Sequence, residues 1–191
     1  MTEIEEYLKS HFGINKSNLS EVGDLFEYKE IAKGEFILKT GQQCQSMSFL
    51  KEGFLRIFAA TQNGDKEITQ WISTKGNFVT DLSSFMFHQP ARWNIQALSP
   101  CYLYTINESN YQKIGQLVPG WKELEKLFLA KCFVVLENRI FNQLSLPAEE
   151  RYQLLFEENP ETFNQVPLQY LASMLGMTPE TFSRIRKKRS S

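Results

Sequence analysis

The sequence is poor in the residues from which disulfide frameworks and metal centres are built. It holds three cysteines, Cys44, Cys101 and Cys132, and two histidines, His11 and His88. The cysteines are odd in number and far apart, which argues against a disulfide framework and fits a reducing compartment. No pair shows a metal-ligand spacing, and an iron–sulfur cluster commonly uses four thiolates in a closely spaced run. We therefore expect no metal site and no cofactor.

Long apolar runs and catalytic motifs are also missing. The sequence has no stretch of about 18 consecutive apolar residues and no signal-peptide pattern. We therefore expect a cytoplasmic protein with no membrane partner. No nucleophile–base pair, metal motif or phosphate-binding loop rises above background, so an enzyme has little support and no catalytic residue is predicted.

Charge is nearly balanced in total but uneven along the chain. The formal net charge is −1 over 191 residues. Residues 1–30 hold seven acids against three lysines, whereas five of the six residues from 184 to 189 are basic. This asymmetry suits a protein that presents one end to phosphates. The length favours two domains.

Short β-rich runs separated by turn residues fill the region from about 25 to 107. A capping box from Thr2 to Glu5 opens a short helix before it, and Gly13 closes that helix. Asn63-Gly64 is the strongest hairpin signal. The pattern predicts a small antiparallel barrel or sandwich. The expected strands are 26–31, 35–39, 47–50, 54–60, 67–73, 93–98 and 102–106.

Two helices should follow, over 108–117 and from about Pro119 to Leu144, the second stopping before Pro147. The long helix carries two apolar rows at helical spacing, which indicates burial on more than one side. We expect the first row to pack on a second copy of the chain and the second row on the chain's own domains. A helix wholly buried within a monomer is the alternative. The first row is Leu127, Ala130, Val134, Glu137, Phe141 and Leu144; the second is Leu129, Phe133, Leu136 and Ile140.

The segment 166–189 has the pattern of a helix-turn-helix. Apolar residues recur at helical spacing in its first half, and Gly176 supplies the left-handed residue that ends the first helix. Thr178 is a natural N-cap for the second helix, with Pro179 at its first position. The apolar positions of the first helix are Leu168, Leu171, Ala172 and Leu175.

The second of these helices should have an inner face and a reading face. Phe182 and Ile185 fall on the side that packs back onto the first helix. The opposite side would look into a DNA major groove. A helical hairpin with a solvated basic end is the alternative. The residues of the reading face are Glu180, Ser183, Arg184 and Lys187.

The order of these parts resembles the Crp/Fnr family of bacterial transcription regulators over nearly the whole chain. The motifs that carry the resemblance are Lys33-Gly34-Glu35 through Gly41, the segment 47–58, and Asn63-Gly64, followed by the long helix and the helix-turn-helix. The resemblance implies an α+β fold: an N-terminal β-barrel or jelly-roll domain like a cyclic-nucleotide-binding domain (1–118), a dimerisation helix (119–145) and a helix-turn-helix DNA-binding domain (146–191). It also implies a homodimer that reads a palindromic operator and contacts RNA polymerase.

The ligand cassette departs from the family pattern. That pattern runs Gly-Glu and later Pro-Arg-Ser/Thr-Ala, with the glutamate on the ribose and the arginine on the cyclic phosphate. This chain has Thr80-Asp81 and, over 90–93, Pro-Ala-Arg-Trp. Arg92 stands one residue late, which on a strand points it to the opposite face, and Trp93 replaces a small residue. We expect that cyclic AMP is not the effector and that its identity is unknown. The alternative is a cyclic-nucleotide-responsive activator that uses Asp81 and Arg92 through a bulge. The candidate ligand residues are Thr80, Asp81, Arg92 and Trp93.

The recognition helix follows the family more closely. Glu180, Ser183 and Arg184 match the Glu-x-x-Ser-Arg arrangement of the oxygen-responsive branch, in which these residues read bases, although that branch's cysteine cluster is missing. Because the chain ends at Ser191, we expect no wing after this helix, so backbone contacts would fall to Arg186, Lys187, Lys188 and Arg189. The candidate DNA-binding residues are Thr178, Glu180, Thr181, Ser183, Arg184, Arg186, Lys187 and Lys188.

These features favour a dimeric, sequence-specific DNA-binding transcription regulator whose β domain senses an unknown small molecule or nothing. A protein-interaction module, with the basic helix on an acidic partner, is a further alternative. Salt-dependent binding to duplex DNA would separate the two.

Overall fold

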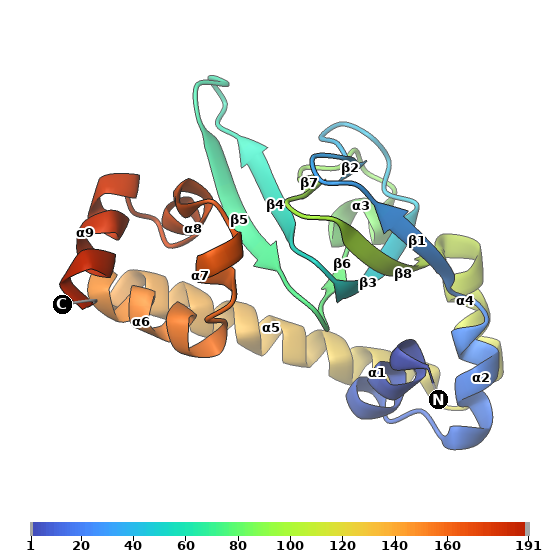
Figure 1. Ribbon diagram of the computed structural model, residues 1–191. Helices are drawn as coiled ribbons and strands as arrows, with labels where there is room; N and C mark the ends of the chain where they lie inside the picture. Colours follow the sequence, from blue (N-terminus) through green and yellow to red (C-terminus); the bar gives the residue numbers. More distant parts are fainter. Residues whose placement is uncertain (1, 190–191) are drawn as a thin grey trace.

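A computed structural model describes residues 2–189. The described part of the chain forms a two-sheet β sandwich, a long helix that runs along it, and a cluster of short helices at the far end of that helix (Figure 1). The α+β fold with a jelly-roll-like β domain, a long helix and C-terminal helices is therefore confirmed.

Both sheets are antiparallel and have four strands each. Their strand orders are β1-β8-β3-β6 and β2-β7-β4-β5. Each expected strand is present, and β6 is an addition. The strands are β1 (Glu27–Ile31), β2 (Phe36–Leu38), β3 (Ser46–Glu52), β4 (Leu55–Ala60), β5 (Glu67–Ser73), β6 (Phe78–Val79), β7 (Asn94–Ala97) and β8 (Cys101–Asn107).

The β4–β5 hairpin forms where Asn63-Gly64 predicts it, with Ala60 paired to Glu67. Another glycine is required by packing. Gly53 has φ 101°, and a Cβ there would lie 2.5 Å from the carbonyl oxygen of Pro100. Only glycine lets the β3–β4 turn approach that backbone. The centre of the sandwich is apolar, and its most buried side chains include Leu50, Leu55, Ile95, Leu103 and Ile106.

Helices α1 (Glu3–Phe12) and α2 (Lys16–Gly23) precede the sandwich, α3 (Leu82–Phe87) lies within it, and α4 (Glu108–Leu117) follows it. The capping box is present, because Thr2 Oγ1 accepts from the Glu5 amide at 3.3 Å and the Glu5 carboxylate accepts from the Thr2 amide. Gly13 ends α1 at φ 69°. Both features of the first helix and the bounds of α4 are as expected, whereas the pattern did not indicate α2 or α3.

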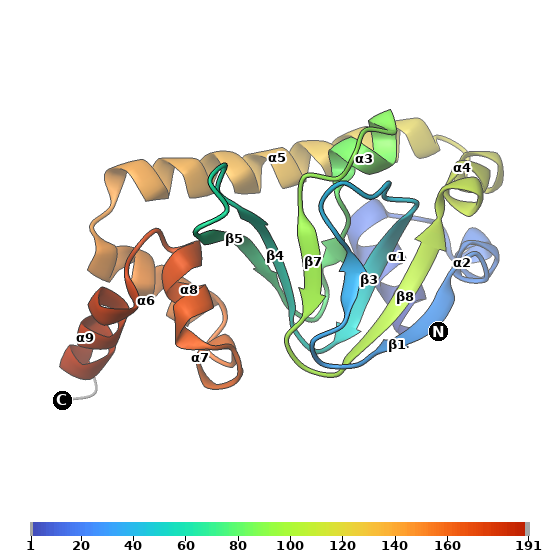
Figure 2. The same cartoon turned by 90° about the horizontal axis from the view of Figure 1, so that it is seen from above.

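The long helix α5 (Trp121–Ser145) begins two residues later than the Pro119 start that we expected, with Gly120 as its N-cap. Its contact with the sandwich is made by Trp121, Leu124 and Phe128. Figure 2 shows how far α5 extends past the sandwich toward the C-terminal helices.

The second apolar row of α5 does not pack on the chain's own domains, so that expectation is wrong, and so is the alternative of a helix wholly buried within a monomer. Phe133 and Ile140 are each 61% exposed. The inward side instead runs through Cys132, Arg139 and Gln143, whose polar atoms hide it from a search for apolar rows. The two predicted rows together form one broad exposed surface, here called the apolar face of α5: Leu127, Leu129, Phe133, Val134, Leu136, Ile140, Phe141 and Leu144.

Four further helices complete the described chain: α6 (Ala148–Glu158), α7 (Thr162–Gln165), α8 (Leu168–Met174) and α9 (Pro179–Arg189). They share a core in which Tyr152, Phe163 and Phe182 meet ring to ring, with centroids 5.1 to 5.7 Å apart. Three residues of the sandwich, Phe54, Ile72 and Leu98, belong to the same apolar cluster.

Candidate DNA-binding surface and ligand region

The turn between α8 and α9 has the local chemistry that its sequence predicts. Gly176 adopts φ 66°, a left-handed conformation that ends α8. The hydroxyl of Thr178 then accepts a hydrogen bond from the Thr181 amide at 3.2 Å and caps the start of α9. This cap and the proline at the first helical position fix where α9 begins.

Helix α9 has one buried face and one exposed face. Phe182 is fully buried and Ile185 nearly so, as expected for the side that packs on α8. The opposite side borders a shallow surface groove, to which α8 contributes Leu168. The α9 residues that line this groove are Pro179, Glu180, Ser183, Arg184 and Lys187. The four residues of the predicted reading face are thus brought together.

The remaining DNA-binding candidates lie outside this groove. Thr178 and Thr181 are joined to each other in the helix cap, where the Thr178 hydroxyl donates to Thr181 Oγ1 at 3.2 Å. Arg186 is exposed on another side of α9. Lys188 forms an ion pair with Glu149 of α6, with 3.1 Å between Nζ and Oε1.

Charge in the groove is mixed. The pKa of Glu180 lies below its ordinary value, because its own backbone N–H and the Thr178 hydroxyl hydrogen-bond to the carboxylate. Glu180 therefore stays ionised at neutral pH, when it accepts hydrogen bonds and donates none. Arg184 presents a planar set of donors beside it.

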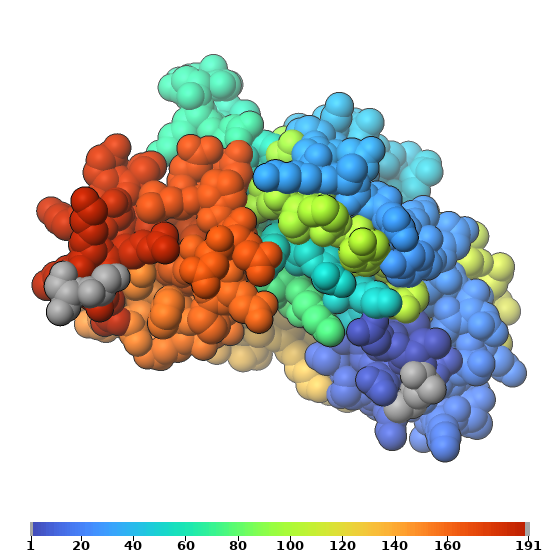
Figure 3. All heavy atoms as spheres, in the orientation of Figure 1, coloured from blue at the N-terminus to red at the C-terminus, as the bar shows by residue number. Residues whose placement is uncertain are grey.

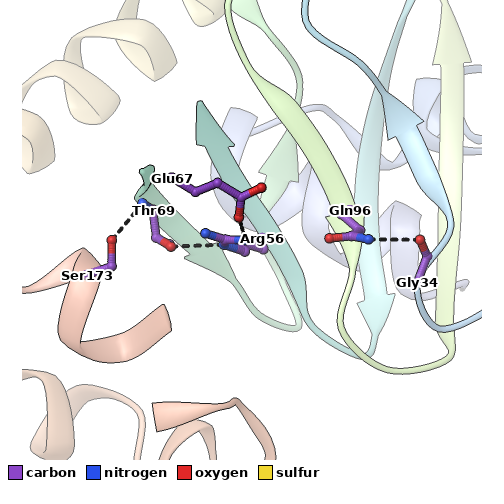
Figure 4. A network of polar contacts seen from close by, with 6 residues as sticks. All are labelled: Gly34, Arg56, Glu67, Thr69, Gln96 and Ser173. Atoms are coloured by element: carbon purple, nitrogen blue, oxygen red, sulfur yellow. Dashed lines mark hydrogen bonds and ion pairs between the residues drawn. The ribbon is translucent and has the colours of Figure 1, made fainter. Parts of the chain in front are cut away.

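The helix-turn-helix is docked against β5, the edge strand of its sheet, through a polar network (Figure 4). The backbone N–H of Thr69 donates to Ser173 Oγ of α8 at 2.9 Å. Covering an edge strand in this way satisfies backbone groups that would otherwise be unpaired. In the space-filling view, the orange and red atoms of the C-terminal helices abut the teal atoms of β4 and β5 (Figure 3).

Arg56 of β4 is the centre of this network. Its side chain is only 3% exposed, its Nη1 lies 2.7 Å from Glu67 Oε2, and its Nε donates to Thr69 Oγ1 at 2.9 Å. The guanidinium is held between two aromatic rings, Phe58 of the same strand and Tyr170 of α8. An arginine inside the apolar run of β4 is a signal in the sequence that we did not use.

A second connection runs from α5 to the turn of the helix-turn-helix. Arg139 donates to the carbonyl oxygen of Met174 at 3.2 Å and lies over the ring of Trp71. Gln143 donates to the carbonyl oxygen of Leu175 at 3.3 Å. These bonds reach the last carbonyls of α8, which no residue of that helix can satisfy. The three parts of the described chain thus meet around α8.

The ligand candidates occupy the loop regions around α3 and before β7. Asp81 is buried and fully engaged by backbone groups of the chain itself. Its carboxylate caps α3 by accepting from the Ser84 amide at 3.0 Å, and it also accepts from the amides of Arg92 and Trp93 at 2.8 and 3.2 Å. This side chain holds the two loops together, which leaves little capacity for a ribose.

The cationic side chain of the cassette points away from the interior. Ala91 is buried at the position where the family pattern has arginine, whereas Arg92 is exposed and lies over the ring of Trp93. Trp93 itself packs on the sandwich core. Thr80 donates to the carbonyl oxygen of Ser46. No pair among these four candidates forms a binding pocket for a cyclic phosphate.

Metal and membrane features were also considered for residues 2–189. Within that range, no group of three or more His, Cys, Asp or Glu side chains is placed to hold a metal ion. None of the helices described there combines the length and the apolar character that a membrane crossing requires.

Comparison with known proteins identifies the fold. Residues 28–116 match the family model of the cyclic nucleotide-binding domain. FixK2 from Bradyrhizobium japonicum aligns with a TM-score of 0.69 at 15% identity, covering 85% of this chain and 83% of that one. A transcriptional regulator of the Crp/Fnr family from Eubacterium rectale aligns with a TM-score of 0.69 at 18% identity, covering 96% and 87%.

One curated relative also matches in sequence. Electron transport regulator A from Shewanella oneidensis is 34% identical over 59 residues, which is 30% of this chain. The match spans 24% of the relative's own length.

Proposed function

Since residues 28–116 form a cyclic nucleotide-binding domain and the chain has the fold of the Crp/Fnr transcription regulators, we propose that it is a dimeric regulator that binds duplex DNA sequence-specifically through α9. It is a DNA reader rather than an enzyme in this proposal. Its partners are a palindromic operator, a second copy of the chain and RNA polymerase, and it acts in the cytoplasm, where bacterial DNA lies.

The exposed face of α9 carries this proposal. Its groove gathers one donor fork, one carboxylate and one hydroxyl, contributed by Arg184, Glu180 and Ser183. Arginine can donate two bonds to the O6 and N7 atoms of guanine, a carboxylate can accept from the N4 amino group of cytosine, and serine bonds to either base. Basic residues at the end of the helix suit the flanking phosphates.

The apolar face of α5 supports the dimer. Eight large apolar or aromatic side chains lie exposed along this one helix, far more than a monomer scatters singly over its surface. A second copy related by a two-fold axis would cover the same surface on both chains. The dimer would present two α9 helices, which suits half-sites roughly 34 Å apart.

The geometry of Asp81 and Arg92 speaks against cyclic AMP as the effector. Asp81 is engaged by three backbone amides, and Arg92 lies outside on Trp93. The alternative, a cyclic-nucleotide-responsive activator that uses these two residues, would require both loops to rearrange.

The reading role of α9 can be tested with two substitutions that should fail differently. An operator is first selected from random duplexes by the wild-type protein. Arg184→Ala should then cost about 1–3 kcal/mol per half-site on that operator, flatten discrimination at one base pair, and leave binding to scrambled DNA nearly unchanged. Lys187→Ala should weaken binding to both duplexes alike and reduce the salt slope by about one.

The measurement is a titration of each variant against operator and scrambled DNA at several salt concentrations. If Arg184→Ala weakens binding to both duplexes equally, α9 is not the sequence reader. If wild type shows no salt-dependent binding to any duplex, the protein-interaction alternative replaces the proposal.

A further inference from the structure

A cavity of about 480 Å³ lies between the sandwich, α1 and α5. Figure 1 shows α1 beside the first half of α5, and the cavity follows this junction. Its walls are mostly aromatic: Phe12 lies 5.1 Å from Trp121 and 4.4 Å from Phe128 between ring centroids, and Tyr7 lies 5.0 Å from Phe78. A volume of this size and an apolar lining are typical of sites for small organic ligands.

The cavity is separate from the region of Asp81 and Arg92. Of the four candidate ligand residues, only Thr80 borders it. Its distinguishing wall is the N-terminal helix α1, which contributes Tyr7 and Phe12. The sequence motifs of the ligand cassette therefore gave no indication of this site.

One polar pair lies within the aromatic lining. The hydroxyl of Tyr111 donates a hydrogen bond to the carboxylate of Glu125, which lies on α5. Burial and the neighbouring carboxylate raise the pKa of Tyr111 above its ordinary value, so the phenol keeps its proton and remains a donor. A carboxylate has more acceptor sites than this one bond uses. Glu125 can therefore accept a further hydrogen bond from a molecule in the cavity.

The charges around the cavity disfavour an anion. Lys131 is the cationic side chain in its described lining, and that residue is exposed on α5. Arg56 is committed to the contact with α8, and Arg92 lies outside. A phosphate or sulfonate in this cavity would meet the Glu125 carboxylate without a buried cation to offset it.

We infer that the cavity binds a neutral, largely aromatic small molecule that donates a hydrogen bond to Glu125. That such a ligand acts as the effector rests on the proposed function, but its binding does not. The rim of the cavity supports a link between the two. Leu129 and Leu136 border the cavity and also belong to the apolar face of α5. An occupant would thus contact the surface on which the second copy packs.

Two dyes that share one ring system test the ligand class. N-phenylnaphthylamine is neutral, carries one N–H donor and fluoresces in apolar surroundings; its analogue anilinonaphthalene sulfonate adds an anion. Fluorescence titration of the full-length protein should give a dissociation constant on the order of 10 μM for the neutral dye. The sulfonated dye should bind about tenfold more weakly. Equal affinities would overturn the inference.

Three variants locate the site. Val135 lines the cavity and Phe133 does not, and both lie on α5, so Val135→Trp should abolish dye binding while Phe133→Trp leaves it within about twofold of wild type. Glu125→Gln should strengthen binding of the sulfonated dye by about tenfold and remove most of the discrimination. Circular dichroism confirms that each variant is folded. If Val135→Trp does not fold, the Glu125→Gln result decides the matter.

The same samples are titrated with duplex DNA. Salt-dependent DNA binding without dye binding overturns the cavity site and leaves the proposed function standing. Dye binding with the expected variant pattern but without DNA binding overturns the proposed function and leaves the cavity site standing. Dye binding that Val135→Trp leaves unchanged in a folded protein places the dye elsewhere and overturns the inference.

Discussion

The guanidinium carbon of Arg56 lies 3.8 Å from the centre of the Tyr170 ring, and this contact joins the β sandwich to the helix-turn-helix. Phe58 holds the other face of the guanidinium at 3.9 Å. An arginine between two rings and bonded to Glu67 and Thr69 is fixed in one orientation. The position of α8, and with it the direction of α9, is therefore set partly by a residue of the β domain.

Replacing this arginine should loosen the docked domain. Arg56→Ala removes both ring contacts and leaves Thr69 Oγ1 without its donor, so we expect the free energy of unfolding to fall by about 2–3 kcal/mol. Denaturant titration measures this. Amide hydrogen exchange at Thr69, whose N–H donates to Ser173, should also become faster. Arg92→Ala is the matched control, because Arg92 stacks on Trp93 at the surface and should change stability by less than about 1 kcal/mol. Equal losses in the two variants would contradict the special role of Arg56.

A charge on the apolar face of α5 should separate the two copies. Val134 is half exposed in the single chain, and a two-fold axis would place each introduced carboxylate close to its mate. Val134→Glu should therefore sediment as a monomer at micromolar concentration, whereas wild type sediments as a dimer. Lys122→Glu serves as the control, since it also adds negative charge to α5 but lies outside the apolar face. A monomeric wild type would rule out the dimer.

Cyclic AMP should bind weakly or not at all. The buried position of the cassette holds Ala91, which offers no charge to a cyclic phosphate. Losing a charge-assisted bidentate contact forfeits about 1.5–3 kcal/mol, or about ten- to hundred-fold in affinity. Calorimetry measures this directly. Micromolar binding that Arg92→Ala abolishes would instead establish the alternative in which Asp81 and Arg92 hold the nucleotide.

The ion pair between Lys188 and Glu149 should weaken DNA binding. Both side chains are largely exposed, and the carboxylate competes with phosphate for the same ammonium group. Glu149→Gln should raise the affinity for any duplex by about two- to fivefold more than the neighbouring control Glu150→Gln, which removes the same charge without a contact to Lys188. Equal effects of the two substitutions would show that the pair itself contributes nothing.

The parts of the fold that depend on neighbouring residues could be predicted from the sequence. The cap at Thr178, the left-handed Gly176 and the burial of Phe182 and Ile185 all follow from spacing within about ten residues. The β4–β5 hairpin follows in the same way from Asn63-Gly64. Local chemistry determines such features almost by itself.

The parts that depend on distant residues could not be predicted in this way. The inward side of α5 includes Arg139 and Gln143, and their partners are carbonyl groups more than 30 positions away. Apolar periodicity does not detect polar residues in a packed face. The cavity presents the same difficulty, because α1 and α5 meet there from opposite ends of the β domain.

The role of Asp81 was within reach of the sequence. An aspartate at the start of Asp81-Leu82-Ser83-Ser84 is an N-cap signal, and α3 begins there. The resemblance to the family cassette drew attention to ligand binding, whereas the side chain bonds to the protein's own backbone.

The turn between α8 and α9 also limits how this protein can diverge. A Cβ at Gly176 would lie 2.2 Å from Nε2 of Gln143, the group that donates to Leu175, and the positive φ of Gly176 already disfavours other residues. Any larger side chain at position 176 therefore requires a different one at position 143, on a helix more than 30 residues earlier. Among descendants of this sequence, the two positions should change together or not at all, and drift at the end of α5 should be restricted by the geometry of a turn in another domain.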